Sequence, residues 1–318
     1  MKDLKPTREG YVEGILQAGR ENSRVVVIEG DVSRSIGSSS FGEEFPGRFF
    51  NLGVSEQDML GEAAGFALEG FIPFVGTYGV FVAGRAWDQI RTSICYMNLK
   101  VRIAGAHGGI SVGPDGATHQ ALEDVAIMRV LPNMKILVPA DSNQTRASVL
   151  ASLDVDGPVY IRFGRNPVPQ VYSIDEQVEI GRGNLLREGN DVTLVACGAM
   201  VSSSLEAASI LKDRGISAGV IDMVSVKPLD KKLLQEQAAR TGAVIVAEDH
   251  QVTGGLFGAV AETLALEMPV KMGVVAVQDS FGTSGSPTEV MERFGLTAFE
   301  ITEKARRILV MNRIPTNG

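Results

Sequence analysis

The feature that most constrains the fold of this 318-residue chain is a repeated alternation of short, largely apolar segments with longer segments of helical period. Apolar segments occur at 23–30, 191–197, 216–222 and 243–248, and helical patterns stand between them, as at 202–214. Strands of a parallel sheet take this form because helices cover both faces of the sheet. The sequence therefore predicts an α/β fold of two doubly wound parallel-sheet domains.

The length and composition allow two domains. A chain of 318 residues with 44% hydrophobic residues can form two sizeable cores. The stretch 166–189 contains Pro167, Pro169 and several polar turn residues, and it lacks a sustained helical period, which is typical of a linker. We therefore expect a first domain at 1–165, a linker at 166–189 and a second domain at 190–318.

Charge and cysteine content argue against several classes of protein. The net charge is −8 and the isoelectric point is about 5.1, so no basic surface for nucleic acid is expected, and phosphorylated ligands would have to be met by local arginines. The start of the chain shows no apolar signal region, and no segment has the length of a membrane span. With only Cys95 and Cys197, a disulfide framework is not expected. We therefore expect a cytoplasmic protein.

The first candidate for chemistry is Glu56. Ser55 and Asp58 have the spacing of an N-cap and its capping box, so a helix is predicted to begin here. An acid in a first helical turn is favoured by the helix dipole without any catalytic role. Apolar residues on both sides, such as Leu52 and Leu60, nevertheless place the carboxyl group at an apolar junction. Burial there would raise its pKa and suit a proton donor to a ring nitrogen.

Aromatic and histidine side chains gather in the residues that follow this acid. Tyr78 and Phe81 are three residues apart, so on a helical turn they share a face and could hold a flat ring, although core packing explains the same spacing. His107 and His119, two of the three histidines, belong to a loop region with five glycines between 105 and 116. Such a loop allows a ligand to approach closely, which favours a site over two isolated structural histidines.

These segments resemble one protein family. The residues Gly-Val-Ser-Glu-Gln-Asp-Met at 53–59, Thr-Tyr-x-x-Phe at 77–81 and Gly-Pro-Asp-Gly-Ala-Thr-His-Gln at 113–120 are similar to the pyrimidine-binding domain of transketolase. The third segment is the most specific of the three. The similarity covers essentially the whole chain, which corresponds to the carboxyl-terminal half of a full-length transketolase.

The resemblance implies a site for thiamine diphosphate. In transketolases the acid that matches Glu56 hydrogen-bonds a ring nitrogen of the aminopyrimidine. Tyr78 and Phe81 match the residues that stack on that ring, with Tyr78 in place of the more usual Phe. Asp31, which follows the predicted strand at 23–30, matches a position near the thiazolium side of the cofactor. A turn cap would explain Asp31 without a ligand.

The resemblance also implies a sugar site. His107 and His119, the expected catalytic histidines, would bind sugar hydroxyls together with Asp115 and stabilise charge on oxygen. A forked guanidinium could hold the phosphate or sulfonate of the donor. The residues expected to contact this anion are Arg165, which matches the family's phosphate-binding arginine, Ser35, and Arg162, which has an equivalent in some relatives only. Surface ion pairs or turn capping would explain these side chains without a ligand.

Half of the transketolase cofactor site is missing from the sequence. The family holds Mg²⁺ and the cofactor diphosphate with a Gly-Asp-Gly segment and a later Asn, whereas Gly30-Asp31-Val32 lacks the second glycine. We therefore expect no metal site in this chain and an amino-terminal partner subunit that supplies those ligands. The helix after Glu56 is rich in small residues, and in transketolase-like proteins this region lies at a subunit interface. The resemblance therefore implies a heterotetramer with two copies of each chain and this helix at a two-fold interface.

The expected activity is transfer of a two-carbon ketol unit from a ketose phosphate or sulfonate to an aldose. The beta subunit of a 2-oxo acid dehydrogenase is an alternative, although it would lack the block at 113–120. A 1-deoxyxylulose-5-phosphate synthase is another, although that enzyme is usually one long chain. The non-enzyme alternative is a catalytically silent scaffold subunit, which would be expected to lose Glu56 or the histidines. His250 is expected to be an interface or cap residue, because the family places no catalytic residue in the second domain.

Overall fold

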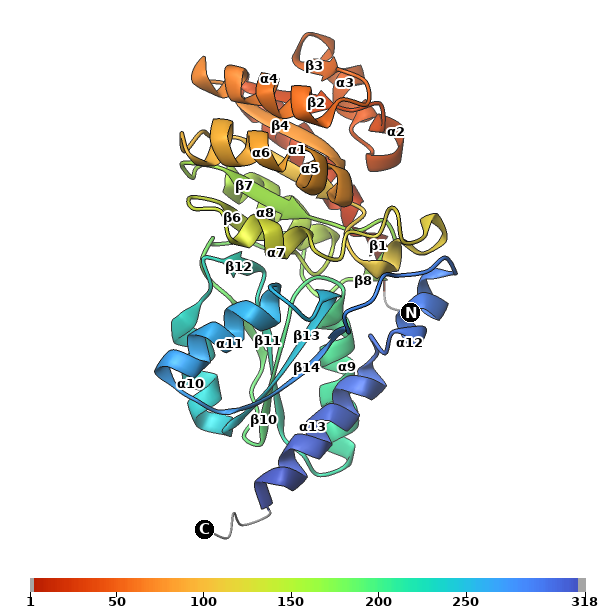
Figure 1. Ribbon diagram of the computed structural model, residues 1–318, viewed down its shortest axis with the longest axis vertical. Helices are drawn as coiled ribbons and strands as arrows, with labels where there is room; N and C mark the ends of the chain where they lie inside the picture. Colours follow the sequence, from red (N-terminus) through yellow and green to blue (C-terminus); the bar gives the residue numbers. More distant parts are fainter. Residues whose placement is uncertain (1–2, 314–318) are drawn as a thin grey trace.

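The chain folds as two large sheets, each with helices on both faces, in a computed structural model that describes residues 3–313 (Figure 1). The first sheet has seven strands and forms the upper part of the molecule in this view, and the second has five strands and forms the lower part. Both sheets are mostly parallel, which confirms the predicted α/β class.

The first sheet is parallel throughout except at one edge. Its edge strand β12 pairs antiparallel with β6 and comes from the second half of the chain, so it ties the two units together. In spatial order the strands are β12 (Ser225–Lys227), β6 (Lys135–Leu137), β7 (Val159–Arg162), β5 (Arg102–Ala106), β4 (Ile72–Tyr78), β2 (Val25–Glu29) and β3 (Phe49–Asn51).

Helices cover both faces of this sheet because successive strand residues point to opposite sides. Val27 and Phe74 belong to one apolar cluster, whereas Ile28 and Val75 belong to another on the opposite face. The first face carries α1 (Thr7–Glu21), α3 (Ser39–Glu44) and α8 (Ser142–Ser152). The second carries α4 (Glu56–Leu68), α5 (Gly79–Arg85), α6 (Trp87–Gln89), η2 (Ile90–Cys95) and α7 (Asp124–Arg129). Shorter turns are α2 (Ser33–Ile36), η1 (Pro46–Arg48) and η3 (Ile110–Asp115).

The second sheet repeats this arrangement. Leu194 packs on one face and Val195 on the other, so both sides of the central strand are apolar. Its strands, in spatial order, are β14 (Lys271–Val277), β13 (Ala243–Gln251), β10 (Val192–Ala196), β11 (Ala218–Asp222) and the antiparallel β9 (Asn184–Arg187). Its helices are α9 (Met200–Asp213), α10 (Lys231–Thr241), α11 (Leu256–Glu267), α12 (Pro287–Arg293) and α13 (Ala298–Arg313).

The stretch 166–189, predicted as a linker, carries two short strands. β8 (Pro167–Pro169) pairs antiparallel with β1 (Leu4–Pro6), and β9 forms the edge of the second sheet. Proline fits β8 because the pair has only two strands, so each proline can lie where no ladder hydrogen bond is needed. The stretch therefore pairs with strands of both units as well as connecting them.

A buried acid fixes a second junction between the units. Asp222, at the end of β11, is fully buried, and its Oδ2 accepts hydrogen bonds from Gln144 Nε2 (2.6 Å) and the Tyr172 hydroxyl (2.6 Å). Gln144 belongs to α8 of the first unit, where the Asp141 side chain caps the helix by accepting from Gln144 N (2.8 Å). Burial raises the pKa of Asp222 to about 7 despite both hydrogen bonds.

We predict that Asp222→Asn removes a pH-dependent loss of stability. The folded-state pKa lies above the ordinary value of an unfolded aspartate, so the folded state binds the proton more tightly, and the free energy of unfolding falls as the pH rises towards about 7. The variant stays neutral, so its stability relative to the native chain should rise by on the order of 2 kcal/mol between about pH 5 and about pH 8. Urea unfolding at both pH values measures this difference, and a constant difference would contradict it.

Candidate functional site

The parallel strands of the first sheet bring several predicted site residues to one edge. β2, β4 and β5 are adjacent and parallel, so their carboxyl ends lie side by side. Asp31 follows β2, Tyr78 ends β4 and His107 follows β5. Ligands of open parallel sheets bind at this edge, because the loops that follow the strands converge there.

Glu56 is the first residue of α4, and only 6% of its surface is exposed. Ser55 occupies the N-cap position as predicted, but the predicted capping box is wrong, because Ser55 makes no side-chain cap to the helix. Its hydroxyl turns back and donates to Leu52 O (3.0 Å) instead. The tight turn before the helix uses Gly53, whose φ of 73° is readily accessible to glycine.

The carboxylate of Glu56 is paired with Arg85, a residue to which sequence reasoning assigned no role. Arg85 Nη1 lies 3.1 Å from Glu56 Oε1, and the Arg85 guanidinium lies 4.2 Å from the centre of the Phe81 ring. Phe81 and Arg85 are four residues apart on α5, so their spacing could have shown that they share a face. Within residues 3–313, no donor reaches Glu56 Oε2, which leaves one oxygen open to a ligand.

The aromatic residues and the two histidines form one ring cluster. The ring centres of Tyr78 and Phe81 are 6.0 Å apart, and the planes of the two rings are inclined by only 18°. Tyr78 lies 4.4 Å from the His107 ring, and Phe81 lies 5.2 Å from the His119 ring. Side chains separated by up to forty-one positions therefore meet at one place. The four rings form an aromatic surface of the kind on which a flat heterocycle could stack.

His107 is buried and neutral. Burial, reinforced by the positive charges of Arg165 and Arg8, lowers its pKa to about 4. Its Nε2 lies 3.4 Å from the Ser35 hydroxyl, which is also 2.8 Å from the Tyr78 hydroxyl. Its Nδ1 is buried without a hydrogen-bond partner among the described residues. An unpaired buried nitrogen is costly, so this atom is a point of local strain in the site.

Asp115, Arg165 and Arg8 border this cluster. Arg165 Nη1 lies 3.2 Å from Asp115 Oδ2, and both side chains are partly exposed. Arg8, which sequence reasoning missed, donates to Ser35 O (2.9 Å) from the first turn of α1. It lies between Thr7 and Glu9 in the sequence, so no local pattern distinguishes it from an ordinary surface arginine. The two arginines give this side of the site a positive character.

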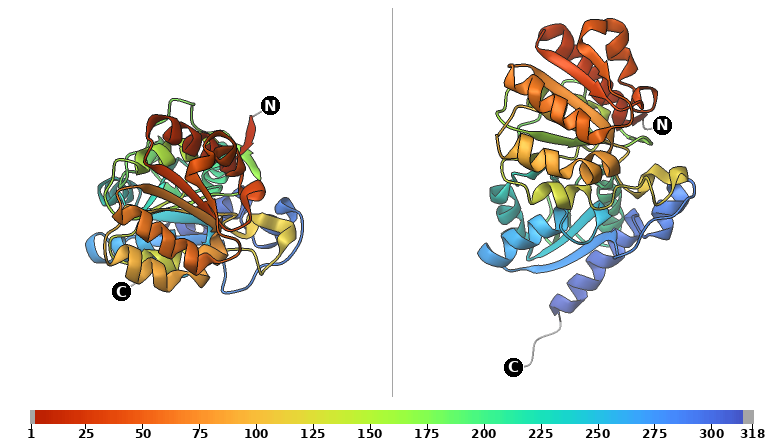
Figure 2. Two further views of the ribbon diagram at one scale, coloured as in Figure 1. Left: turned by 90° about the horizontal axis from the view of Figure 1, so that it is seen from above. Right: turned by 45° about the horizontal axis from the view of Figure 1, so that its top comes forward.

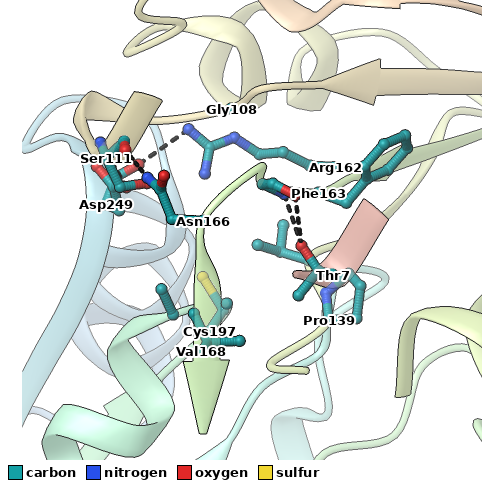
Figure 3. Close-up of a pocket in the computed structure, with 14 residues that line it drawn as sticks. Thr7, Gly108, Ser111, Pro139, Arg162, Phe163, Asn166, Val168, Cys197 and Asp249 are labelled. Carbon is teal, nitrogen blue, oxygen red and sulfur yellow. Dashed lines mark hydrogen bonds between the residues drawn. The ribbon is translucent and has the colours of Figure 1, made fainter. Parts of the chain in front are cut away.

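Arg162, which was expected to contact the donor anion, is engaged by other groups of the chain instead. It is buried between the two units, with Nε 2.9 Å from Asp124 Oδ2 and Nη2 donating to Ala121 O. Nη2 also donates to Asp249 O, and Figure 3 shows Arg162 and Asp249. Burial disfavours its charge, but Asp124 and Asp249 outweigh burial and raise the pKa above the ordinary value. Arg162 lines an interdomain cavity of about 60 Å³, which has room for water.

His250 lies at the same junction and accepts from Ala126 N (3.4 Å), as expected for an interface residue.

Asp31 and Glu29 flank the carboxyl end of β2. Asp31 is exposed and has a φ of 61°, and its carboxylate lies 3.4 Å from Asn51 Nδ2. Glu29 is fully buried, and burial raises its pKa to about 7. Sequence reasoning treated Glu29 as part of a buried strand and assigned it no role.

The described residues show neither a metal cluster nor a membrane helix. Residues 3–313 contain no group of three or more His, Cys, Asp or Glu side chains arranged to hold a metal ion. Within the same range, no helix combines the length and apolar composition that a membrane crossing requires.

Comparison with protein families divides the chain in the same way as the fold. Residues 5–170 match the transketolase pyrimidine-binding domain, and residues 181–301 match the transketolase C-terminal domain.

Individual relatives match over nearly the full length. The chain is 40% identical to the 6-deoxy-6-sulfo-D-fructose transketolase subunit of Clostridium sp. strain MSTE9, over 95% of this chain and 94% of that protein. It is 35% identical to one of the apulose-4-phosphate transketolase subunits of Phocaeicola vulgatus, over 93% and 97%. A solved structure of a split-gene transketolase, described as an inactive beta4 tetramer, is 48% identical, covers 97% of this chain and 99% of that chain, and superposes with a TM-score of 0.89. The chain therefore belongs to the transketolase family, as the carboxyl-terminal subunit of an enzyme that is split between two chains.

Proposed function

We propose that this chain supplies the pyrimidine-binding and sugar-binding half of a thiamine diphosphate site, and that the assembled enzyme transfers a two-carbon ketol unit from a ketose phosphate or sulfonate to an aldose. The observation that carries the proposal is the meeting of Glu56 with the ring cluster of Tyr78, Phe81, His107 and His119 at one sheet edge. The relatives that act on a sulfosugar and on a sugar phosphate support the donor class.

The residues present fit the pyrimidine end of the cofactor. Glu56 has one free carboxylate oxygen, and the rings of Tyr78 and Phe81 stand nearby, so this chain can offer a proton to a ring nitrogen and faces for stacking. Asp31 lies on the same edge, where the thiazolium side would be held. When bound, the cofactor supplies a carbon nucleophile and an electron sink.

The sugar contacts follow from the charge state of each group. Neutral His107 can donate or accept a hydrogen bond without bringing a positive charge into a buried site. His119 is partly exposed and can reach a hydroxyl from the opposite side of the ring cluster. Asp115 can accept from sugar hydroxyls, and Arg165 and Ser35 can hold the donor anion. Because Arg162 is engaged with Asp124, we assign it a structural role.

The partner completes the site in this proposal. We infer that an amino-terminal transketolase subunit supplies the ligands of Mg²⁺ and of the diphosphate, as in the family, and that two copies of each chain form a heterotetramer in the cytoplasm. The exposed Gly61 and Gly65 on α4 have open space beside them, and Val54 and Leu68 are exposed at 71% and 59%, which supports a two-fold interface there. We place the boundaries of this half of the enzyme at 1–165 for the first domain, 166–189 for the linker and 190–318 for the second domain.

We predict that the purified chain alone is inactive and binds thiamine diphosphate weakly. Stacking and one carboxyl group remain, but the charged diphosphate lacks its metal, so most of the electrostatic binding energy is missing. Titration with Mg²⁺ and thiamine diphosphate, with and without an amino-terminal subunit, followed by a ketol-transfer assay, measures this. Turnover by the chain alone would refute the split site, and no turnover by the complete assembly would favour a silent scaffold.

We predict that Glu56→Gln lowers ketol transfer by about a hundredfold or more, because an amide cannot exchange a proton with the ring nitrogen as the carboxyl group does. Assembly with the partner, followed by size-exclusion chromatography, should be unchanged. The same substitution at Glu43, an exposed residue of α3, is the control for the loss of a carboxylate outside the site. Near-native turnover of the Glu56 variant would remove this residue from the mechanism.

We predict that Arg165→Ala raises the Michaelis constant for a phosphorylated or sulfonated ketose by roughly tenfold to a hundredfold, the range for one hydrogen bond to a charged group. The Michaelis constant for hydroxypyruvate should change little, because its only anion is a carboxylate bonded directly to the reacting carbonyl, and this short donor has no distal phosphate or sulfonate to reach Arg165. The two donors serve as internal controls for each other. Equal effects on both would mean that Arg165 only orients Asp115.

A further inference from the structure

The loop of residues 107–120 carries three of the proposed sugar contacts, and it begins with an unfavourable backbone conformation. His107 has a φ of 56°, in the left-handed region that few residues other than glycine adopt, although histidine does so more often than most. Such a conformation persists only where the surroundings hold it in place. The first two amides after His107 are held within the first unit, by Gly108 N donating to Phe163 O (3.1 Å) and Gly109 N donating to Ala121 O (2.9 Å).

The next two amides are held by the second unit. Ile110 N donates to Asp249 Oδ1 (2.7 Å), and Ser111 N lies 3.4 Å from Asp249 Oδ2. Asp249 belongs to β13 of the five-stranded sheet, and only 6% of its surface is exposed. The carboxylate lies so close to Gly109 that a Cβ at that position would collide with it. A charged acceptor in a buried setting makes strong hydrogen bonds to backbone amides.

Other contacts hold the backbone of Asp249 and the loop 107–120 in place. Arg162 Nη2 donates to Asp249 O (2.9 Å), so the backbone of Asp249 is held by the first unit, and Figure 3 shows Ser111 and Asn166 beside it. Gln120 Nε2 donates to both Ile110 O (3.1 Å) and Thr283 O (3.0 Å), which bridges the loop to the segment before α12. The right view of Figure 2 shows this segment, in blue, against η3, in yellow.

We propose that Asp249 is a positioning residue of the active site, through which the C-terminal domain sets the conformation of the loop 107–120 and so the placement of His107, Asp115 and His119. The proposal rests on the proposed function for its effect on catalysis. It gives the C-terminal domain a part in the reaction although Asp249 touches neither cofactor nor sugar. A displacement of catalytic groups by about 1 Å can lower a rate by about a hundredfold, so a loosened loop should reduce turnover.

The structural part of the proposal is tested on the chain alone, without cofactor or partner. Hydrogen exchange of the Ile110 and Ser111 amides should accelerate by roughly tenfold or more in Asp249→Ala, the factor implied by the loss of a hydrogen bond to a charged acceptor. Asp249→Asn keeps one acceptor oxygen and should give a smaller increase. Asp230 is the matched control, because it is equally buried at 6%, lies in the same domain and accepts from Leu233 N (3.0 Å) away from the loop. Exchange in 108–119 that is equal in the Asp249 and Asp230 variants would overturn the proposal.

The catalytic part is tested in the assembled enzyme. Asp249→Asn should lower kcat for ketol transfer by about tenfold or more while the affinity for thiamine diphosphate stays native, and Asp230→Asn should change neither quantity. Native kcat in Asp249→Asn, with exchange of the loop accelerated, would overturn the positioning role. If the native assembly itself transfers no ketol unit, the proposed function fails, and the exchange measurement still decides whether Asp249 holds the loop.

Discussion

The buried ion pair between Arg162 and Asp124 is the interaction on which the junction of the two units depends. Arg162 ends β7, Asp124 begins α7, and the Tyr160 hydroxyl donates a second hydrogen bond to the same carboxylate oxygen (2.7 Å). Loss of one member would leave an uncompensated buried charge, which costs about 3 to 5 kcal/mol. Because the guanidinium also donates to Ala121 O and Asp249 O, one side chain contacts the residue that follows the loop 107–120 and the second sheet as well as ending β7. These contacts therefore help to set the geometry of the candidate site at the carboxyl edge of the first sheet.

Electrostatics at the ring cluster differ from those of the chain as a whole. The net charge is −8, yet the arginines Arg8, Arg85 and Arg165 gather around Glu56 and the two histidines. Burial, together with the charges of Arg165 and Arg8, keeps His107 neutral, so the positive charge of the site lies on groups that cannot lose it at physiological pH. An anionic donor sugar would thus be attracted by fixed charges, while the neutral imidazole stays available for hydrogen bonding. These two properties would conflict if His107 itself carried the charge.

Sequence periodicity predicted those features of the fold that depend on local sequence. The apolar segments at 23–30 and 243–248 became β2 and β13, because burial on both faces leaves a continuous signal. The spacing of Tyr78 and Phe81 also predicted a shared face correctly. The capping box at Ser55 failed because a nearer carbonyl competes for its hydroxyl, and such competition has no sequence signature. The structural pairing of Arg162 was not predicted for a similar reason. Its partner Asp124 is thirty-eight residues away in the sequence, and β12 brings the second unit against the edge of the first sheet.

The structure separates the folding of the chain from the completeness of its site. One apolar cluster runs from Met59 and Leu60 under α4, through Ile136 and Val138, to Leu234 and Val260 of the second unit. This shared core buries the sheet faces regardless of what contacts Glu56 from outside, so the free energy of folding comes from within the chain. Glu56 and the ring cluster lie at the carboxyl edge of the sheet, where Arg85 keeps 54% of its side chain exposed. In the proposed enzyme, a division between two chains would fall across the ligand site and leave this core undivided. Such a division would let this chain fold on its own while catalysis depended on assembly.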